Sequence, residues 1–388
     1  MPLDRKLRYG MVGGGPGAFI GAVHRRAARL DGLAELVAGS FSSDPDKSRR
    51  QGRHLHLDPP RVYDSYAVMA EAEAARDDGI DFVSIVTPNF LHFAIAKAFI
   101  EQGIHVICDK PMTTTLDDAE ALCRLVDEHE VVFCLTHNYT GYPMVKQARA
   151  MVQSGAIGTV RKVVAEYPQG WLAERLEDED NKQADWRTDP DRAGAGALGD
   201  IGSHAENLAR YVTGLELERL CADVGTVVPG RGIDDDANML VRFSNGARGV
   251  LYCSQVSVGE ENDLRIRVYG TEAALDWRQE DPHYLVVKRN GAPREVYTHG
   301  SDYLADAVQH VNRLPAGHPE AFIEAFGNIY HNACRTIAAR VAGEEPDPHD
   351  LDFPTVQDGA IGVHFIQQAL ESGHQGAAWV DMDYAPPA

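Results

Sequence analysis

Long apolar runs, paired cysteines and an excess of basic residues are all missing from this sequence of 388 residues. No apolar run approaches the roughly 20 residues that span a bilayer, and the first residues lead directly into a strand-like segment without a signal-type stretch. The six cysteines are scattered and form no Cys-x-x-Cys pair, which argues against a disulfide framework or a structural zinc site. We therefore expect a cytoplasmic protein that does not enter membranes.

The charge balance excludes further classes of partner. The formal net charge is -21, whereas nucleic acids and anionic membrane surfaces select basic proteins. His54 and His56 alternate in a polar stretch, which is a poor metal signature, so no metal site is expected. With 44% hydrophobic residues the chain is long enough for two domains with substantial cores. A small-molecule partner fits this composition best.

The most informative segment runs from Tyr9 to Gly21, where an apolar strand meets a glycine cluster and then a predicted helix. Gly13 permits a tight turn, Gly15 lets the backbone approach a pyrophosphate, and Ala18 or Gly21 permits close helix packing. Phosphates would then lie on the helix N-terminus, where Phe19 and Ile20 stand. A plain strand-to-helix loop is the alternative that the motif alone leaves open.

The following segments favour the dinucleotide-binding interpretation because strands alternate with helices. Strands are expected over 34–38, 81–87, 104–108 and 131–135, and helices over 20–30, 94–101 and 116–128. This order predicts an α/β, doubly wound parallel sheet of the Rossmann type in a first domain, residues 1–138.

Residues 139–388 are expected to form a second, α+β domain for substrate binding and oligomerisation. Strand-like alternation covers 160–168, 219–228, 236–243, 247–257 and 263–270, and helices are expected over 320–342 and 356–372. Ser244-Asn245-Gly246 is typical of a hairpin turn, so the sheet should be open and mostly antiparallel. A half-covered sheet of this kind predicts a homodimer or homotetramer.

Two pairs of residues carry candidate chemistry. Asp109 and Lys110 follow a buried-looking strand, where a lysine could polarise an alcohol or carbonyl oxygen beside a bound cofactor. A surface lysine capped by Asp109 is the alternative. Asp200 and His204 are four residues apart, so at the start of a helix they would share one face and serve as an acid/base pair. A helix cap with a structural histidine is the alternative here.

Aromatic residues beside polar donors are typical of sugar recognition. Trp186 and Arg187 lie upstream of the Asp200 pair and could cover the cofactor or stack on a sugar. Tyr167, Gln169 and Trp171 alternate along an expected strand over 163–171, so they would share one face, although sheet packing explains the pattern as well.

Four motifs in order resemble the Gfo/Idh/MocA family, which is named for glucose-fructose oxidoreductase, inositol dehydrogenase and a rhizopine-catabolism protein. They are the glycine turn, Thr87-Pro88-Asn89 with His92, Asp109-Lys110-Pro111, and the segment Gly199 to His204. The resemblance covers nearly the whole chain. It implies an NAD(P)-dependent dehydrogenase or reductase that acts on sugars, sugar derivatives, cyclitols or a few other small molecules.

The resemblance also assigns roles by position. It implies that Lys110 and Asn138 stand beside the nicotinamide. Tyr139 is then expected in the substrate site. The segment around His318 resembles one in sugar-oxidising members, so His318 is also a candidate substrate residue. This family usually has Glu where this chain has Asp109, and many relatives carry an arginine shortly after the position of Tyr139. The expected cofactor contacts are Gly13, Gly15, Ala18, Phe19, Ile20, Ser40, Ser43, Thr87, Pro88, Asn89, His92, Asp109, Lys110, Asn138, Trp186 and Arg187.

We expect a ring hydroxyl of a sugar, glycoside or cyclitol to lose its proton to His204, aided by Lys110 and Asp200, as hydride passes to nicotinamide. The resemblance alone favours C3 of a pyranoside. NAD is the expected cofactor, and NADP is the alternative because Ser40, Ser43 and nearby basic residues occupy the corner where an acid marks NAD enzymes. A keto-sugar reductase, a dehydrogenase of a non-sugar molecule and a non-catalytic cofactor-binding sensor are the alternative functions.

Overall fold

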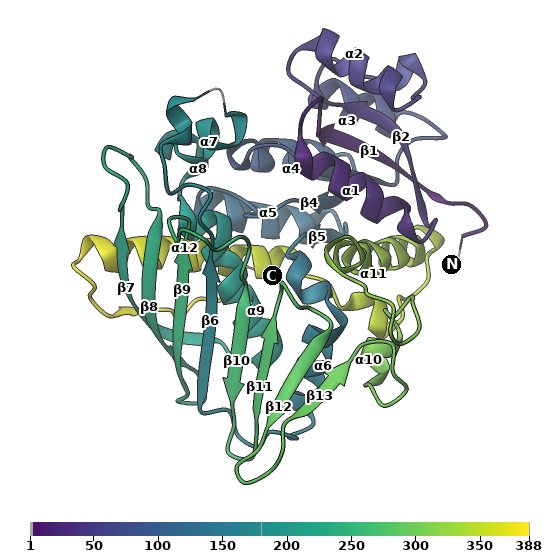
Figure 1. The fold of residues 1–388 in the computed structure, drawn as a ribbon. Helices are drawn as coiled ribbons and strands as arrows, with labels where there is room; N and C mark the ends of the chain where they lie inside the picture. The colour runs from purple at the N-terminus through teal and green to yellow at the C-terminus, as the bar shows by residue number, and fades with distance from the viewer. Residues whose placement is uncertain (1–2, 180, 388) are drawn as a thin grey trace.

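The computed structural model describes residues 3–179 and 181–387 and contains two sheets (Figure 1). The first is a five-stranded parallel sheet with strand order β2-β1-β3-β4-β5. Its strands are β1 (Leu7–Gly13), β2 (Ala34–Ser40), β3 (Phe82–Val86), β4 (His105–Cys108) and β5 (Phe133–Leu135). Helices α1 (Phe19–Leu30), α2 (Pro45–His54), α3 (Tyr66–Ala74), α4 (His92–Ile100) and α5 (Leu116–Glu128) connect them. The predicted doubly wound Rossmann sheet is confirmed.

Local sequence explains where these helices begin. The Thr115 hydroxyl accepts from the backbone N–H of Asp118 at 3.3 Å, and Asp117 and Asp118 stand in the first turn of α5. Negative side chains there complement the helix dipole. As a result α5 begins at Leu116, the residue that the sequence predicts.

The second sheet has nine strands in the order β13-β12-β11-β10-β6-β9-β8-β7-β14. They are β6 (Lys162–Pro168), β7 (Leu217–Gly225), β8 (Asp236–Phe243), β9 (Arg248–Ser254), β10 (Arg265–Tyr269), β11 (Ala274–Arg278), β12 (Tyr284–Lys288), β13 (Glu295–Thr298) and β14 (Val380–Asp381). All described pairs are antiparallel except β6 with β9. The mostly antiparallel sheet is confirmed, and β11 to β14 are strands that the sequence pattern did not predict.

Helices cover one face of this sheet and share its core (Figure 1). The chain passes from the first sheet to the second through the turn η3 (Asn138–Gly141) and helix α6 (Pro143–Gln153). Helix α9 (Ser203–Thr213) contacts both α6 and β6, and the short helix α10 (Asp306–Gln309) also contacts α6. The site residues on α9 are therefore held against the middle of the second sheet.

The two long C-terminal helices, α11 (Phe322–Ala342) and α12 (Val356–His374), join the two halves. Phe326 and Ile329 of α11 pack in the same core as Leu7 and Met11 of β1. Helix α12 contacts both α5 of the first domain and β7 of the second sheet. Among the described residues no helix combines the length and apolar character needed to cross a bilayer.

Candidate active site

The glycine turn between β1 and α1 has the shape of a phosphate cradle. Gly13 has φ +88°, which favours glycine, and a Cβ at Gly15 would stand 2.6 Å from the carbonyl oxygen of Phe41. A Cβ at Gly21 would stand 2.4 Å from Cα of Gly14, so the close packing falls on Gly21, while Ala18 only precedes the helix. Phe19, in the first turn of α1, is 67% exposed. The helix N-terminus is therefore open to a ligand.

The corner after β2 carries hydroxyl groups rather than a free acid. Ser40 is buried at the end of the strand, and Ser43 is exposed. The carboxylate of Asp44 accepts from the backbone N–H groups of Asp46 at 2.9 Å and Lys47 at 3.1 Å, so it caps α2. This corner therefore has no carboxylate in the ordinary ribose-binding position directly after the strand.

The segment after β3 is held in place by a buried histidine. Nδ1 of His92 lies 2.9 Å from the carbonyl oxygen of Pro111, and its Nε2 lies 2.9 Å from that of Thr87. Because His92 is fully buried, the expectation that it lines the cofactor path needs correction: it joins two loops instead. Asn89 begins the turn η2 (Asn89–Leu91) between these loops and is buried, and Pro88 precedes it.

Lys110 and Asp200 meet although they come from different domains. Asp200 lies in the wide π-helical turn η5 (Leu198–Gly202), which leads into α9. Nζ of Lys110 donates to Oδ1 of Asp200 at 3.1 Å and also to its backbone carbonyl. Asp109 accepts from the backbone N–H of Lys110 at 2.9 Å, so the shorter acid positions the main chain at the lysine.

Asp200 has two further partners on its other oxygen. Nε2 of Gln255 donates to Oδ2 at 2.7 Å, and Nε of Arg187 lies 3.4 Å from the same atom. Burial alone would raise the pKa of Asp200, but the cations of Lys110 and Arg187 hold that pKa well below its ordinary value. Asp200 is therefore a permanent anion that anchors Lys110.

His204 stands in the first turn of α9, but its partner is not Asp200. Its Nδ1 lies 3.3 Å from Nδ1 of His137, and no hydrogen bond joins it to Asp200 within the described part of the chain. Burial, with the nearby charge of Lys110, holds the pKa of His204 well below its ordinary value. The two members of the expected acid/base pair therefore do not bond each other, and the imidazole of His204 is neutral at pH 7.

A hydrogen-bonded wall lies beside His204. The Tyr139 ring contacts His204 edge-on, with centroids 4.7 Å apart, and its hydroxyl is hydrogen-bonded to that of Tyr167. The Tyr167 hydroxyl donates to Oδ1 of Asn262 at 2.7 Å, and Nε2 of Gln169 donates to the same oxygen at 2.7 Å. Nε1 of Trp171 donates to Gln169 at 3.1 Å. We call Tyr139, Tyr167, Gln169, Trp171 and Asn262 the polar wall.

The structure corrects the expectation that Tyr167, Gln169 and Trp171 share one face of a strand. The strand expected over 163–171 ends earlier, because β6 stops at Pro168, so Gln169 and Trp171 lie in the loop that follows. Alternation along a strand therefore does not align them with Tyr167. Hydrogen bonds through Asn262 bring them together instead.

Trp186 and Arg187 end the short helix α7 (Lys182–Arg187), which is followed by α8 (Pro190–Ala193). The Arg187 guanidinium lies over the Trp186 ring, 4.3 Å from its centroid. Helix α8 contacts α7 and also η2 of the first domain. This segment thus reaches from the second domain to the rim of the nucleotide-binding sheet.

His318 lies outside this group of residues. It is exposed in the loop before α11, and its Nδ1 lies 3.3 Å from the carbonyl oxygen of Pro315. Within the described residues no hydrogen bond or ion pair links it to Lys110 or His204. The single chain therefore does not bring His318 to the site that the sequence assigned to it.

Some buried polar atoms near the site have no hydrogen-bond partner, and they indicate whether a dinucleotide fits there. Among the described residues, Oγ1 of Thr87 and Nδ2 of Asn138 have no hydrogen-bond partner. Such atoms are costly unless a ligand or water satisfies them. Both belong to the expected cofactor contacts, and the glycine cradle lies at the end of β1, the strand beside β3. The residues present therefore fit a nicotinamide dinucleotide.

Three residues of the site were not predicted from the sequence: His137, Gln255 and Asn262. His137 adjoins Asn138 just after β5, where the fold rule for parallel sheets already points to a ligand site. Gln255 follows β9 and Asn262 precedes β10, and only the pairing of these strands with β6 brings them to the site. No local sequence signal marks the last two.

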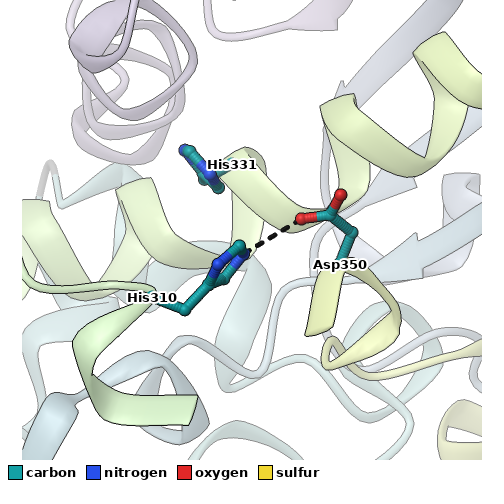
Figure 2. Close-up of side chains that lie close together, drawn as sticks. All are labelled: His310, His331 and Asp350. Atoms are coloured by element: carbon teal, nitrogen blue, oxygen red, sulfur yellow. Dashed lines mark hydrogen bonds and ion pairs between the residues drawn. The ribbon is translucent and has the colours of Figure 1, made fainter. Parts of the chain in front are cut away.

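A second histidine cluster lies away from the site. Potential ligand atoms of His310, His331 and Asp350 lie within 4.8 Å of one another (Figure 2). His310 bonds Asp350 at 3.0 Å, Arg335 donates to both oxygens of Asp350 at 2.8 Å, and His331 bonds Asp31 at 3.0 Å. These contacts satisfy the cluster without an ion, and they tie α11 to the turn η6 (Pro348–Leu351).

A Rossmann domain with a phosphate cradle, joined to a domain that sets a carboxylate and a neutral histidine beside a lysine, defines a nicotinamide-dependent oxidoreductase. The family model described as an oxidoreductase family with an NAD-binding Rossmann fold matches residues 7–150. The GFO/IDH/MocA C-terminal domain model matches residues 145–276. The chain belongs to the Gfo/Idh/MocA family of oxidoreductases.

Solved structures and a curated relative agree with this assignment. An oxidoreductase from Sinorhizobium meliloti is 48% identical, with a TM-score of 0.88 over 97% of this chain and 100% of that one. An inositol dehydrogenase homologue from Azotobacter vinelandii, crystallised with NAD+, is 36% identical, with a TM-score of 0.94 over 98% of both chains. Levoglucosan dehydrogenase from Pseudarthrobacter phenanthrenivorans is 30% identical over 79% of this chain and 81% of its own length.

Proposed function

We propose that this protein oxidises a ring hydroxyl of a sugar, glycoside or cyclitol, with NAD as hydride acceptor. The observation that carries the proposal is the contact of Lys110 with Asp200 across the two domains, next to a neutral His204 whose pKa is held low. A cation beside a neutral base is the arrangement that alcohol oxidation needs, because the oxygen must lose a proton as hydride leaves carbon.

The roles of the chain's own groups follow from their chemistry. When bound, NAD supplies the hydride acceptor. Nζ of Lys110 donates to the substrate oxygen and stabilises the negative charge that develops there. Nε2 of His204 takes the hydroxyl proton. Asp200 holds Lys110, and Tyr139 fixes the His204 ring.

The substrate class is supported by the site and by relatives. The polar wall offers amide groups of Gln169 and Asn262 beside aromatic rings, which suits a polyhydroxylated ring. The Azotobacter homologue was also crystallised with NADH and myo-inositol. C3 of a pyranoside is the regiochemistry we propose within this class.

The test is reduced-nicotinamide absorbance with NAD and a panel of free sugars, glycosides, anhydrosugars and inositols. We expect turnover with one group of this panel and none with the Lys110→Met variant. Turnover with none of them, although NAD binds, would overturn the proposal and favour a keto-sugar reductase.

The same assay with NADP tests the alternative cofactor. It is favoured by the corner after β2, where Asp44 caps α2 and Ser40 and Ser43 carry hydroxyl groups. Turnover with both NADP and NAD would show that no carboxylate at this corner excludes the 2′-phosphate of NADP.

We also propose a homodimer or homotetramer. Large apolar side chains on the second sheet are exposed, among them Leu240 at 50% and Val296 at 52%. A second copy of the chain would cover such residues. Light scattering coupled to gel filtration tests this, and a monomer at micromolar concentration would contradict it.

A further inference from the structure

We propose that His137 is a positioning residue that fixes the tautomer of His204, so that His204 presents an unprotonated Nε2 to the substrate hydroxyl. The inference rests on the proposed function, because there His204 receives a proton. It gives a role to His137, which was not among the site residues expected from the sequence.

The first step is the geometry of the pair. The two Nδ1 atoms lie 3.3 Å apart, and the rings meet edge-to-face at 85° with centroids 5.2 Å apart. His137 is 2% exposed and His204 is 6% exposed, so water has little access to this contact. Two buried nitrogens at this distance form a hydrogen bond only if one carries hydrogen and the other does not.

The second step is the charge state of the pair. Burial, with Lys110, lowers the pKa of His137 to about 3 and that of His204 well below its ordinary value. Both rings are therefore neutral at pH 7, and each has one N–H group. Asp358 and Arg210 also influence the pKa of His137, with opposite signs.

The third step chooses between the two possible hydrogen bonds. If Nδ1 of His137 donated, Nε2 of His204 would carry the hydrogen and could not accept a proton. If Nδ1 of His204 donates, its Nε2 is bare and can accept the proton of the hydroxyl. After that transfer the imidazolium keeps its Nδ1–H bond to His137. Only the second arrangement allows His204 to act as the base.

The backbone holds His137 in this position. Its amide N–H donates to the carbonyl of Leu135 at 3.0 Å, and its own carbonyl accepts from the Thr140 hydroxyl at 2.9 Å. His137 follows β5 of the first sheet, whereas His204 begins α9, which packs on the second. The pair thus fixes the base relative to the nucleotide-binding domain.

The experiment compares His137→Leu, which lacks an acceptor, with His137→Asn, whose amide oxygen can replace Nδ1. For His137→Leu we expect kcat to fall roughly 10- to 100-fold, with KM and NAD affinity nearly unchanged. His137→Asn should restore most of kcat. His364→Leu is the matched control, since it removes a buried histidine of α12 whose ring stacks on Tyr384, 4.5 Å between centroids, rather than on His204.

A second readout needs no substrate. Nitrogen-15 spectra of labelled histidines should place the hydrogen of His204 on Nδ1 in the wild type and shift it toward Nε2 in His137→Leu. The inference would be overturned if folded His137→Leu kept the kcat of the wild type. It would also be overturned if His204 in the wild-type protein carried its hydrogen on Nε2. If no sugar or cyclitol is oxidised but the tautomer is as stated, the proposed function fails and the tautomer assignment stands.

Discussion

The two sides of the candidate site differ in how their polar atoms are satisfied. On the nucleotide side, Thr87 and Asn138 have buried polar atoms without hydrogen-bond partners among the described residues. On the substrate side, the polar wall satisfies its own hydroxyl and amide groups. Unpaired polar atoms gain from a ligand, whereas a paired network holds its shape without one. The difference indicates that the cofactor supplies the missing hydrogen bonds on the nucleotide side. The substrate side has its hydrogen bonds before any ligand binds.

The largest expected effect lies at the junction of the two sides. His204→Ala should lower kcat by about 10²- to 10⁴-fold, because proton transfer loses its base. NAD affinity should remain nearly unchanged, since His204 contacts the polar wall rather than the glycine turn. Steady-state kinetics and NAD titration measure the two quantities separately. Loss of NAD binding would show that His204 belongs to the nucleotide side.

The polar wall can be broken at its centre. Tyr167→Phe removes the hydroxyl that bonds both Tyr139 and Asn262 and leaves only their direct bond at 3.3 Å, which should cost about 1–3 kcal/mol of unfolding free energy. Denaturant unfolding measures it. Tyr252→Phe is the control, because that hydroxyl bonds Ser257 at a half-exposed position and should cost about 0.5 kcal/mol or less. Equal losses in both variants would contradict a preorganised wall.

The nucleotide side can be disturbed without touching a polar group. Gly15→Ala places a Cβ 2.6 Å from the Phe41 carbonyl oxygen, so the cradle must shift. We expect NAD affinity to fall about tenfold, or about 1.4 kcal/mol, in a calorimetric titration. Gly362→Ala in α12, where a Cβ meets no atom within 4 Å, should leave NAD affinity unchanged. An unchanged affinity in Gly15→Ala would place the phosphates elsewhere.

The smallest effect concerns pH. The native pKa of His137 is lowered to about 3, so between that pH and about 6.5 the unfolded chain binds a proton that the native chain does not. Stability therefore falls as pH falls through this window, and this group contributes about 0.7 kcal/mol of the loss between about pH 7 and about pH 6. The dependence of unfolding free energy on pH should be shallower in His137→Asn. Parallel curves for the two proteins would refute the neutral state of His137.

The sequence predicts the nucleotide side better than the substrate side, and the reason is physical. The roles of Gly13 and Gly15 depend on neighbours within one turn, so local spacing indicates them. His137 meets His204 across 67 positions, and Tyr167 meets Asn262 across 95. Such contacts depend on how strands pair and where β6 ends, which local alternation does not determine. For the same reason the spacing of Asp200 and His204 did not show that Asp200 bonds Lys110 and Gln255 instead of His204.

The most direct test is a crystal structure of the protein with NADH and a substrate that it accepts. The reacting oxygen of the substrate should lie within about 3.2 Å of both Nζ of Lys110 and Nε2 of His204. Thr87 and Asn138 should gain partners from the cofactor, while the polar wall keeps its hydrogen bonds. A substrate oxygen bonded to neither Lys110 nor His204, with Thr87 and Asn138 still unpaired, would contradict the assignment of both sides of the site.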